Sequence, residues 1–239
     1  METGAVAGFE ALARVVAPDG SIQEPGNIIE EIEQDIDLFH DLMWTILSSI
    51  KREISHLFEK YKGFYVSFNM PPAAVGTESR IDVMFREPGL TKYLGRLVIE
   101  ITERQALSEK GRAALQLGRR YGVGVAVDDF GTGHSGLAQI AGFDLDILKI
   151  DQSLITPVVT NRTSARMLRG IVALAAALRI RTVAEGVETW EQAFFVRAAG
   201  VDCGQGWFWS KALPAEEVEG VLRKGFAAGM GSSQSLPVE

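Results

Sequence analysis

Apolar residues in this chain gather in short runs, and most of the runs end in a carboxylate, amide or ammonium side chain. Amphipathic segments long enough for a helix separate most of them, so strands and helices alternate as they do around a sheet of parallel strands. The pattern predicts seven strands, over residues 9–16, 64–69, 97–100, 123–129, 147–151, 182–185 and 201–205.

The helices between these strands carry recognisable signals. Apolar residues recur at helical spacing over residues 35–61, which predicts one long amphipathic helix that ends before Gly63. Later helices have start signals of the capping or proline type. These signals are at Thr163 and Ser164, at Ser108, at Thr189 with Gln192, and at Pro214.

Alternation over most of the chain leaves two candidate folds, a closed (β/α) barrel and an open doubly wound sheet. The barrel is favoured, because neither a GxGxxG turn nor a GxxxxGK[ST] loop follows an early strand. Glu10 lies near the start of the first apolar run, which fits a first strand that runs opposite to the others. The predicted class is therefore α/β, a modified TIM-type (β/α)8 barrel with one antiparallel strand.

A length of 239 residues suits one barrel domain, and no linker-like stretch interrupts the chain. We expect residues 1–8 to form an N-terminal extension, residues 9–226 the barrel and residues 227–239 a flexible C-terminal tail.

Composition and charge disfavour several classes of partner and site. A formal charge of −7 disfavours binding to polymeric nucleic acid or to an anionic membrane. The single Cys203 excludes an internal disulfide and a thiolate zinc site, and the three His residues lack metal-ligand spacing. No apolar run reaches the roughly 18 residues of a membrane span, and the N-terminus does not resemble a signal peptide. The expected location is the cytoplasm.

If the barrel closes, the side chains at the C-terminal ends of its strands gather at one mouth. The polar residues at these positions are Glu10, Asn69, Glu100, Asp128, Asp129, Lys149, Glu185 and Gln205. Two like charges about 4 Å apart repel by roughly 4 kcal/mol at an effective dielectric of 20, so such acids either protonate or bind cations. Oxygen donors without His or Cys select hard ions such as Mg²⁺ and Mn²⁺. Any single acid could instead cap a helix or pair with a base.

Asp128 and Asp129, in VAVDDFGTGHSGL, are the sharpest local signal. Adjacent acids at a strand end can serve two ions about 3.5–4 Å apart, an arrangement suited to in-line displacement at phosphorus. The glycines that follow could equally form an ordinary turn. Lys149 lies among apolar strand residues, so its ammonium needs a carboxylate partner, either in a structural ion pair or as a cation that stabilises charge on phosphorus. Asp151, two residues on, faces the same way.

Together these motifs resemble the EAL-domain phosphodiesterases of bacterial cyclic di-GMP signalling, over residues 9–222. The matching strings are EALAR from Glu10, SFN ending at Asn69, EITE from Glu100 to Glu103, DDFGTG from Asp128, KID from Lys149, AEGVE from Ala184 and QG at Gln205. Each string alone is weak, but their order, spacing and strand-end placement are specific.

The resemblance implies two Mg²⁺ or Mn²⁺ ions and attack of a metal-bound hydroxide on cyclic di-GMP, which gives linear 5′-pGpG. It implies one ion held by Glu10, Asn69, Glu100 and Asp128, and a second held by Asp128, Asp129 and Glu185. By the same resemblance the catalytic residues are Lys149, Glu185, Asp151 and Gln205, the substrate contacts are Arg14, Leu12 and Asp129, and the loop supports are Glu103 and Glu188. A homodimer and an attached or partner sensory domain are implied as well.

The chain departs from the usual family pattern in three places. Val15 follows Arg14 where the family usually has Trp, and His134 and Gly136 replace an aromatic residue and a Ser in the glycine loop. Residues 24–39 also differ from the usual form. These changes bear on rate and regulation. Two alternatives to a phosphodiesterase remain open. One is a cyclic di-GMP receptor module that signals through protein contacts, and the other is a barrel lyase that works on a metal-held enolate.

Overall fold

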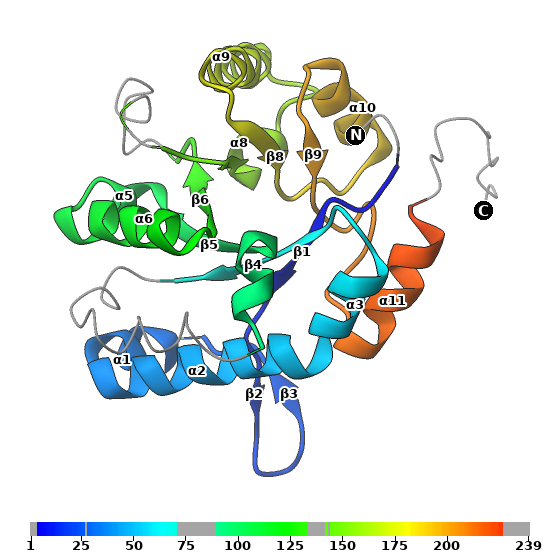
Figure 1. The fold of residues 1–239 in the computed structure, drawn as a ribbon. Helices are drawn as coiled ribbons and strands as arrows, with labels where there is room; N and C mark the ends of the chain where they lie inside the picture. Colours follow the sequence, from blue (N-terminus) through cyan, green and yellow to red (C-terminus); the bar gives the residue numbers. More distant parts are fainter. Residues whose placement is uncertain (1–3, 27, 71–88, 133–141, 143, 227–239) are drawn as a thin grey trace.

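In the computed structural model, the described part of the chain comprises residues 4–26, 28–70, 89–132, 142 and 144–226. A seven-stranded sheet with the order β1-β4-β5-β6-β7-β8-β9 curls through its centre, and helices cover its outside (Figure 1). Each neighbouring pair in this sheet is parallel. The strands are β1 Gly8–Ala11, β4 Tyr65–Asn69, β5 Leu97–Thr102, β6 Gly124–Phe130, β7 Ile147–Ile150, β8 Arg181–Ala184 and β9 Cys203–Gly204.

The expected direction of the first strand was wrong. β1 pairs in parallel with β4, with Glu10 opposite Ser67. The apolar run over residues 9–16 is not one strand, because β1 ends at Ala11 and Val15–Val16 form β2, which pairs antiparallel with β3 (Ile22–Gln23). Gly20, at a φ of +82°, lies in the connection between β2 and β3. Glu10 is therefore near the end of a short parallel strand, and the antiparallel pairing belongs to the hairpin that projects from the body (Figure 1).

The predicted helices are present with two differences in their bounds, and four short helices, α1, α5, α8 and η2, were not predicted. The long helix is divided at Ile54 into α2 and α3. α9 begins at Arg162, earlier than expected, because the side chain of Asn161 accepts hydrogen bonds from the backbone N–H groups of the next turn. The helices are α1 Ile28–Gln34, α2 Ile36–Glu53, α3 Ser55–Lys60, α5 Glu103–Ala106, α6 Glu109–Tyr121, α8 Gln152–Ile155, α9 Arg162–Leu178, α10 Trp190–Ala198, α11 Ala215–Lys224 and the 3-10 helix η2 Thr91–Arg96.

The predicted helix starts at Ser108 and at Thr189 with Gln192 are confirmed. Ser108 accepts a hydrogen bond from Gly111 N at the start of α6, and Thr189 and Gln192 form a reciprocal capping box at the start of α10. The predicted tail, residues 227–239, and the glycine loop that contains His134 and Gly136 lie outside the described residues. The division into extension, barrel and tail stays a prediction.

The two faces of the sheet bury different residues. On the helix-facing side, Leu97, Ile99 and Ile101 of β5 join the large apolar core that packs under the helices. On the concave side a separate small apolar layer is formed by Val98, Ala126, Ile147 and Val183. Successive side chains of a strand point to opposite faces, so the residues two positions further on lie directly above this layer.

No helix in the described ranges has the length and apolarity that crossing a membrane requires.

Candidate metal centre

A layer of charged side chains lies above the small apolar layer inside the sheet. Each member follows an apolar residue by two positions on β5, β6 or β7, or at the end of β8. The four residues are Glu100, Asp128, Lys149 and Glu185. Because successive side chains of a strand alternate between its two faces, these carboxylates and the ammonium all point to the inside of the sheet and lie together at its carboxyl-terminal mouth.

Lys149 is the centre of this layer. Its Nζ lies 2.7 Å from Glu100 Oε2, 2.8 Å from Glu185 Oε1, 3.1 Å from Asp128 Oδ2 and 3.2 Å from Glu10 Oε2. The side chain is only 3% exposed. Burial alone would lower the pKa of the ammonium, but the surrounding carboxylates outweigh burial and raise it. Lys149 is therefore held as a cation.

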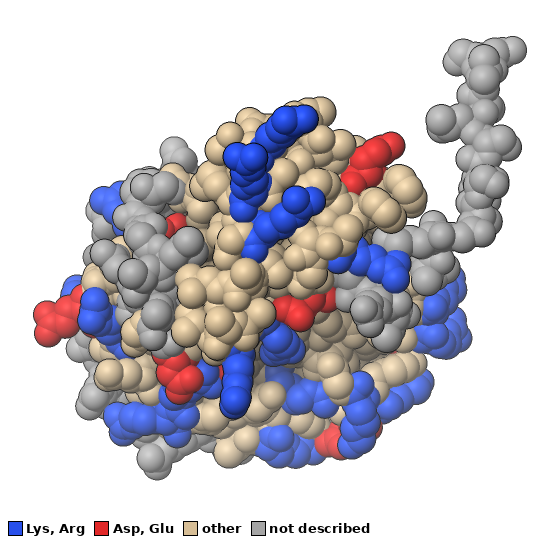
Figure 2. All heavy atoms as spheres, turned by 90° about the horizontal axis from the view of Figure 1, so that it is seen from above, with Lys and Arg blue, Asp and Glu red and all other residues tan. Residues whose placement is uncertain are grey.

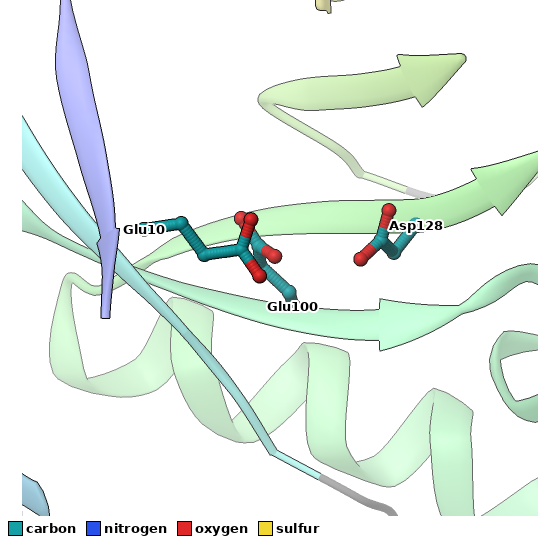
Figure 3. Close-up of side chains that lie close together, drawn as sticks. All are labelled: Glu10, Glu100 and Asp128. Atoms are coloured by element: carbon teal, nitrogen blue, oxygen red, sulfur yellow. The ribbon is translucent and has the colours of Figure 1, made fainter. Parts of the chain in front are cut away.

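The carboxylates form two groups whose oxygen atoms lie close enough to share an ion. Glu10, Glu100 and Asp128 make the first group, and Asp128, Asp129 and Glu185 make the second, with the chosen atoms of each group within 4.8 Å of one another. Figure 3 shows the first group, with the carboxylates of Glu10 and Glu100 side by side and Asp128 turned toward them. Asp128 is the one residue that both groups contain.

Asp129 joins the second group because the end of β6 is irregular. In a regular strand Asp128 and Asp129 would point to opposite faces. Here the pairing of β6 with β7 shifts register between Val127 and Phe130, and Asp129 has a φ of +56°. A positive φ is uncommon for a residue with a side chain, and such conformations concentrate at functional sites. The distortion turns two consecutive acids toward one mouth.

The side chain of Glu10 is fixed from three sides. Asn69 Nδ2 donates to Glu10 Oε1 at 3.2 Å, and Gln205 Nε2 donates to Glu10 Oε2 at 2.8 Å, in addition to the contact from Lys149. β1 and β9 stand at the two ends of the sheet. The hydrogen bond from Gln205 therefore joins its two edges at the mouth.

Electrostatics favour the binding of cations here. Four carboxylates contact one ammonium and a fifth, that of Asp129, lies beside them, so the mouth carries excess negative charge. Burial raises the pKa of Glu100 to about 7 and that of Glu185 to about 9, against the opposing effect of Lys149. Burial, followed by the charge of Asp128, also raises the pKa of Asp129. The donors are all oxygen atoms, which are the preferred ligands of hard divalent ions, so this set of residues fits such ions.

Two further predicted residues lie beside the mouth. The side chain of Asp151 caps α8 by accepting a hydrogen bond from Ser153 N, and its charge also acts on Asp129. Glu103, which is buried, accepts a hydrogen bond from Gly131 N at 3.1 Å. Glu103 therefore holds the first residue of the glycine segment that follows β6.

The remaining predicted residues make contacts outside the acidic groups. Arg14 donates from Nη1 to Ala13 O and lies 3.9 Å from Glu24 Oε1, while Leu12 is 46% exposed. Glu188 is exposed, and its backbone N–H donates to Gln192 Oε1. The structure does not bring these three side chains together with the carboxylates.

Sequence reasoning missed how the loops after β8 and β9 are locked together. Gly206 has a φ of +151°, and a Cβ atom there would lie 2.2 Å from Val187 O. Val187 N donates to Gln205 O, and Phe208 N donates to Val187 O. This close approach fixes Gln205 beside the strand end that carries Glu185. The glycine that follows Gln205 in the QG motif was the available signal.

The family model for the EAL domain matches residues 1–212. The chain belongs to the EAL domain family. Two relatives from Escherichia coli are named probable cyclic di-GMP phosphodiesterases. PdeB is 32% identical over 221 residues, which are 91% of this chain and 42% of PdeB. PdeN is 34% identical over 223 residues, which are 92% of this chain and 43% of PdeN. This EAL domain therefore spans less than half the length of either relative.

A solved structure has the same fold. The PaMucR phosphodiesterase in complex with c-di-GMP superposes with a TM-score of 0.77 at 26% identity, covering 87% of this chain and 86% of that chain. The barrel-type α/β class predicted for this EAL domain is confirmed by this likeness and by the curled parallel sheet. Membership of the family inferred from the motifs is confirmed too.

Proposed function

We propose that this EAL domain is a metal-dependent phosphodiesterase that hydrolyses cyclic di-GMP to linear 5′-pGpG. The observation that carries the proposal is the pair of carboxylate groups that share Asp128 at the mouth. The names of the relatives support the same substrate and reaction class. The receptor and lyase alternatives are less well supported, since the acids, Asn69 and Lys149 are all in place around one mouth.

Two divalent ions, Mg²⁺ or Mn²⁺, fit the two groups. Glu10, Asn69, Glu100 and Asp128 would hold one ion, and Asp128, Asp129 and Glu185 would hold the other. When bound, such ions supply Lewis acidity, activation of water and neutralisation of charge on a phosphodiester. In the absence of ions Lys149 neutralises part of the same charge, which keeps the carboxylates in position.

Lys149 acts as a fixed donor in this proposal. Because its surroundings keep it protonated, it cannot serve as the base that removes a proton from water. Its ammonium would orient the attacking water and stabilise the charge that develops on phosphorus. Asp151 and Gln205 would support it, Asp151 from the cap of α8 and Gln205 through its hydrogen bond to Glu10.

Substrate binding needs positive charge in an acidic mouth. Arg14 follows β1 closely, and its guanidinium can bind a phosphate with two hydrogen bonds once it leaves its weak pairing with Glu24. We place Leu12 and Asp129 beside it as further substrate contacts. Glu103 would hold the glycine segment, and Glu188 would hold the loop after β8. The homodimer and the sensory partner stay predictions.

The test is incubation of the purified chain with cyclic di-GMP and Mg²⁺ or Mn²⁺, with linear pGpG followed by chromatography and EDTA as the metal-free control. Metal-dependent product that disappears in Glu185→Gln would support the proposal. Tight binding of cyclic di-GMP without product would contradict hydrolysis and favour the receptor module.

A further inference from the structure

One segment of this acidic chain carries positively charged side chains and no acidic ones. Residues 152–184 contain five Arg and no Asp, Glu or Lys, whereas the whole chain has a formal charge of −7. The segment comprises α8, the connection to α9, α9 itself and β8. Seen from above, on the side of α9, Figure 2 shows basic side chains standing along the middle of a largely uncharged face. The net charge of the chain conceals this local excess.

Three of these arginines share one side of α9. Arg162, Arg166 and Arg169 are spaced by four and three residues, so they lie one above another along the helix. All three are exposed. Within the described part of the chain, none of them forms an ion pair or a side-chain hydrogen bond. Three neighbouring like charges without a carboxylate partner repel one another, and a bound anion would relieve that repulsion.

The same three side chains line a surface hollow of about 330 Å³ between α9, the segment before it and α10. Phe195 of α10 lies in its wall, and the guanidinium carbon of Arg169 is 5.4 Å from the centre of the Phe195 ring. Val159, which also lines the hollow, is 48% exposed. The hollow therefore offers cationic groups beside an apolar and aromatic surface. We call it the arginine hollow.

We propose that the arginine hollow binds a phosphate-bearing anion that also carries an apolar or planar part, such as a free nucleotide or an anionic lipid headgroup. Guanidinium groups match phosphate oxygen atoms in pairs of hydrogen bonds, and Phe195 gives a base or an acyl chain a surface to cover. The volume is at the lower end of the range for small-molecule sites, roughly 300–1,000 Å³. This ligand is additional to the substrate proposed for the mouth.

Calorimetric titration of the intact chain with inorganic pyrophosphate, and separately with GMP, tests the proposal. EDTA is present throughout, so that the metal-free mouth repels anions. The wild type should bind at least one probe saturably, and Arg166→Ala/Arg169→Ala should weaken binding about tenfold or more, since charge-assisted hydrogen bonds are lost. Arg223→Ala/Lys224→Ala removes the same charge from exposed positions of α11 and should bind as the wild type does.

Flotation with vesicles identifies the source of the phosphate. Vesicles of phosphatidylglycerol are compared with vesicles of phosphatidylcholine for the same three proteins. Binding to phosphatidylglycerol alone, lost only in Arg166→Ala/Arg169→Ala, assigns the hollow to a lipid headgroup, whereas binding of GMP assigns it to a nucleotide. No binding of any probe, or an equal loss in both double variants, overturns the proposal.

Hydrolysis of cyclic di-GMP is measured separately on each variant. If the wild type has no turnover but still binds a probe through Arg166 and Arg169, the proposed function fails while the arginine hollow stands. If turnover is present and no probe binds, the arginine hollow is refuted while the proposed function stands.

Discussion

The acidic mouth and the arginine hollow use charge in opposite ways. We define the mouth by Glu10, Glu100, Asp128, Asp129 and Glu185 around Lys149. There most of the charged atoms are wholly or partly buried, and the ammonium contacts four carboxylates. In the hollow the guanidinium groups are exposed and, within the described chain, form no ion pair or side-chain hydrogen bond, although that of Arg169 lies over the ring of Phe195. A charge in the mouth thus serves the fold and the site together, whereas a charge in the hollow serves only a ligand.

The largest contrast should come from the removal of one cation in each region. Lys149→Met leaves buried carboxylates without their shared partner, which we expect to cost about 3–5 kcal/mol of unfolding free energy in EDTA. It should also abolish turnover. Arg166→Met removes the same charge from an exposed position and should change stability by less than about 0.5 kcal/mol. Urea denaturation at neutral pH measures both, and equal losses would contradict the contrast.

The next effect concerns catalysis alone. Asp128→Asn keeps the shape of a residue that both carboxylate groups contain, yet it removes the charge. Loss even of an outer partner of a metal ligand typically costs 10–100-fold, so we expect turnover of cyclic di-GMP to fall by more than about 100-fold. Asp144→Asn, at an exposed residue paired with Arg119, is the matched control and should be fully active. Near-normal hydrolysis by Asp128→Asn would refute the assignment of the ligands.

Metal-free stability should depend on pH through the mouth. The pKa values of Glu100 and Glu185 are raised to about 7 and about 9 by burial, so the folded protein holds protons that the unfolded chain has released. Stability should therefore fall as the pH rises from about 5 to about 9. Glu185→Gln should flatten that fall, and Arg166→Met should leave it unchanged. Thermal melts in EDTA across this range measure the slope, and a rise in stability would show that the sign is wrong.

The acidic layer was predictable from the sequence because it depends only on the period of two in a strand. Glu100, Asp128 and Lys149 each stand two residues beyond a small or apolar residue that faces the inside of the sheet. The direction of β1 was not predictable in this way. Its apolar run looked continuous, although β1 ends at Ala11 and the next strand, β2, starts at Val15 and pairs with β3 across the turn that contains Gly20.

The hollow was missed for a different reason. The net charge of −7 is a sum over the whole chain, so it disfavoured polymeric nucleic acid and anionic membranes as partners without showing where positive charge is concentrated. The arginines at positions 162, 166 and 169 become a site only when the fold sets them beside Phe195, which lies on another helix. A local count of charge over residues 152–184 was the available signal.

The smallest predicted effect concerns backbone strain. Asp129 and Arg179 are the described non-glycine residues with positive φ, at 56° and 60°. Arg179 is the C-cap residue of α9, a position where glycine is common. Asp129→Gly and Arg179→Gly should each gain up to about 1 kcal/mol, because glycine adopts this conformation without a steric cost. Only Asp129→Gly should lose turnover, since only there does the strained backbone aim a carboxylate into the mouth. If both variants keep full activity, the irregularity of β6 does not serve the site.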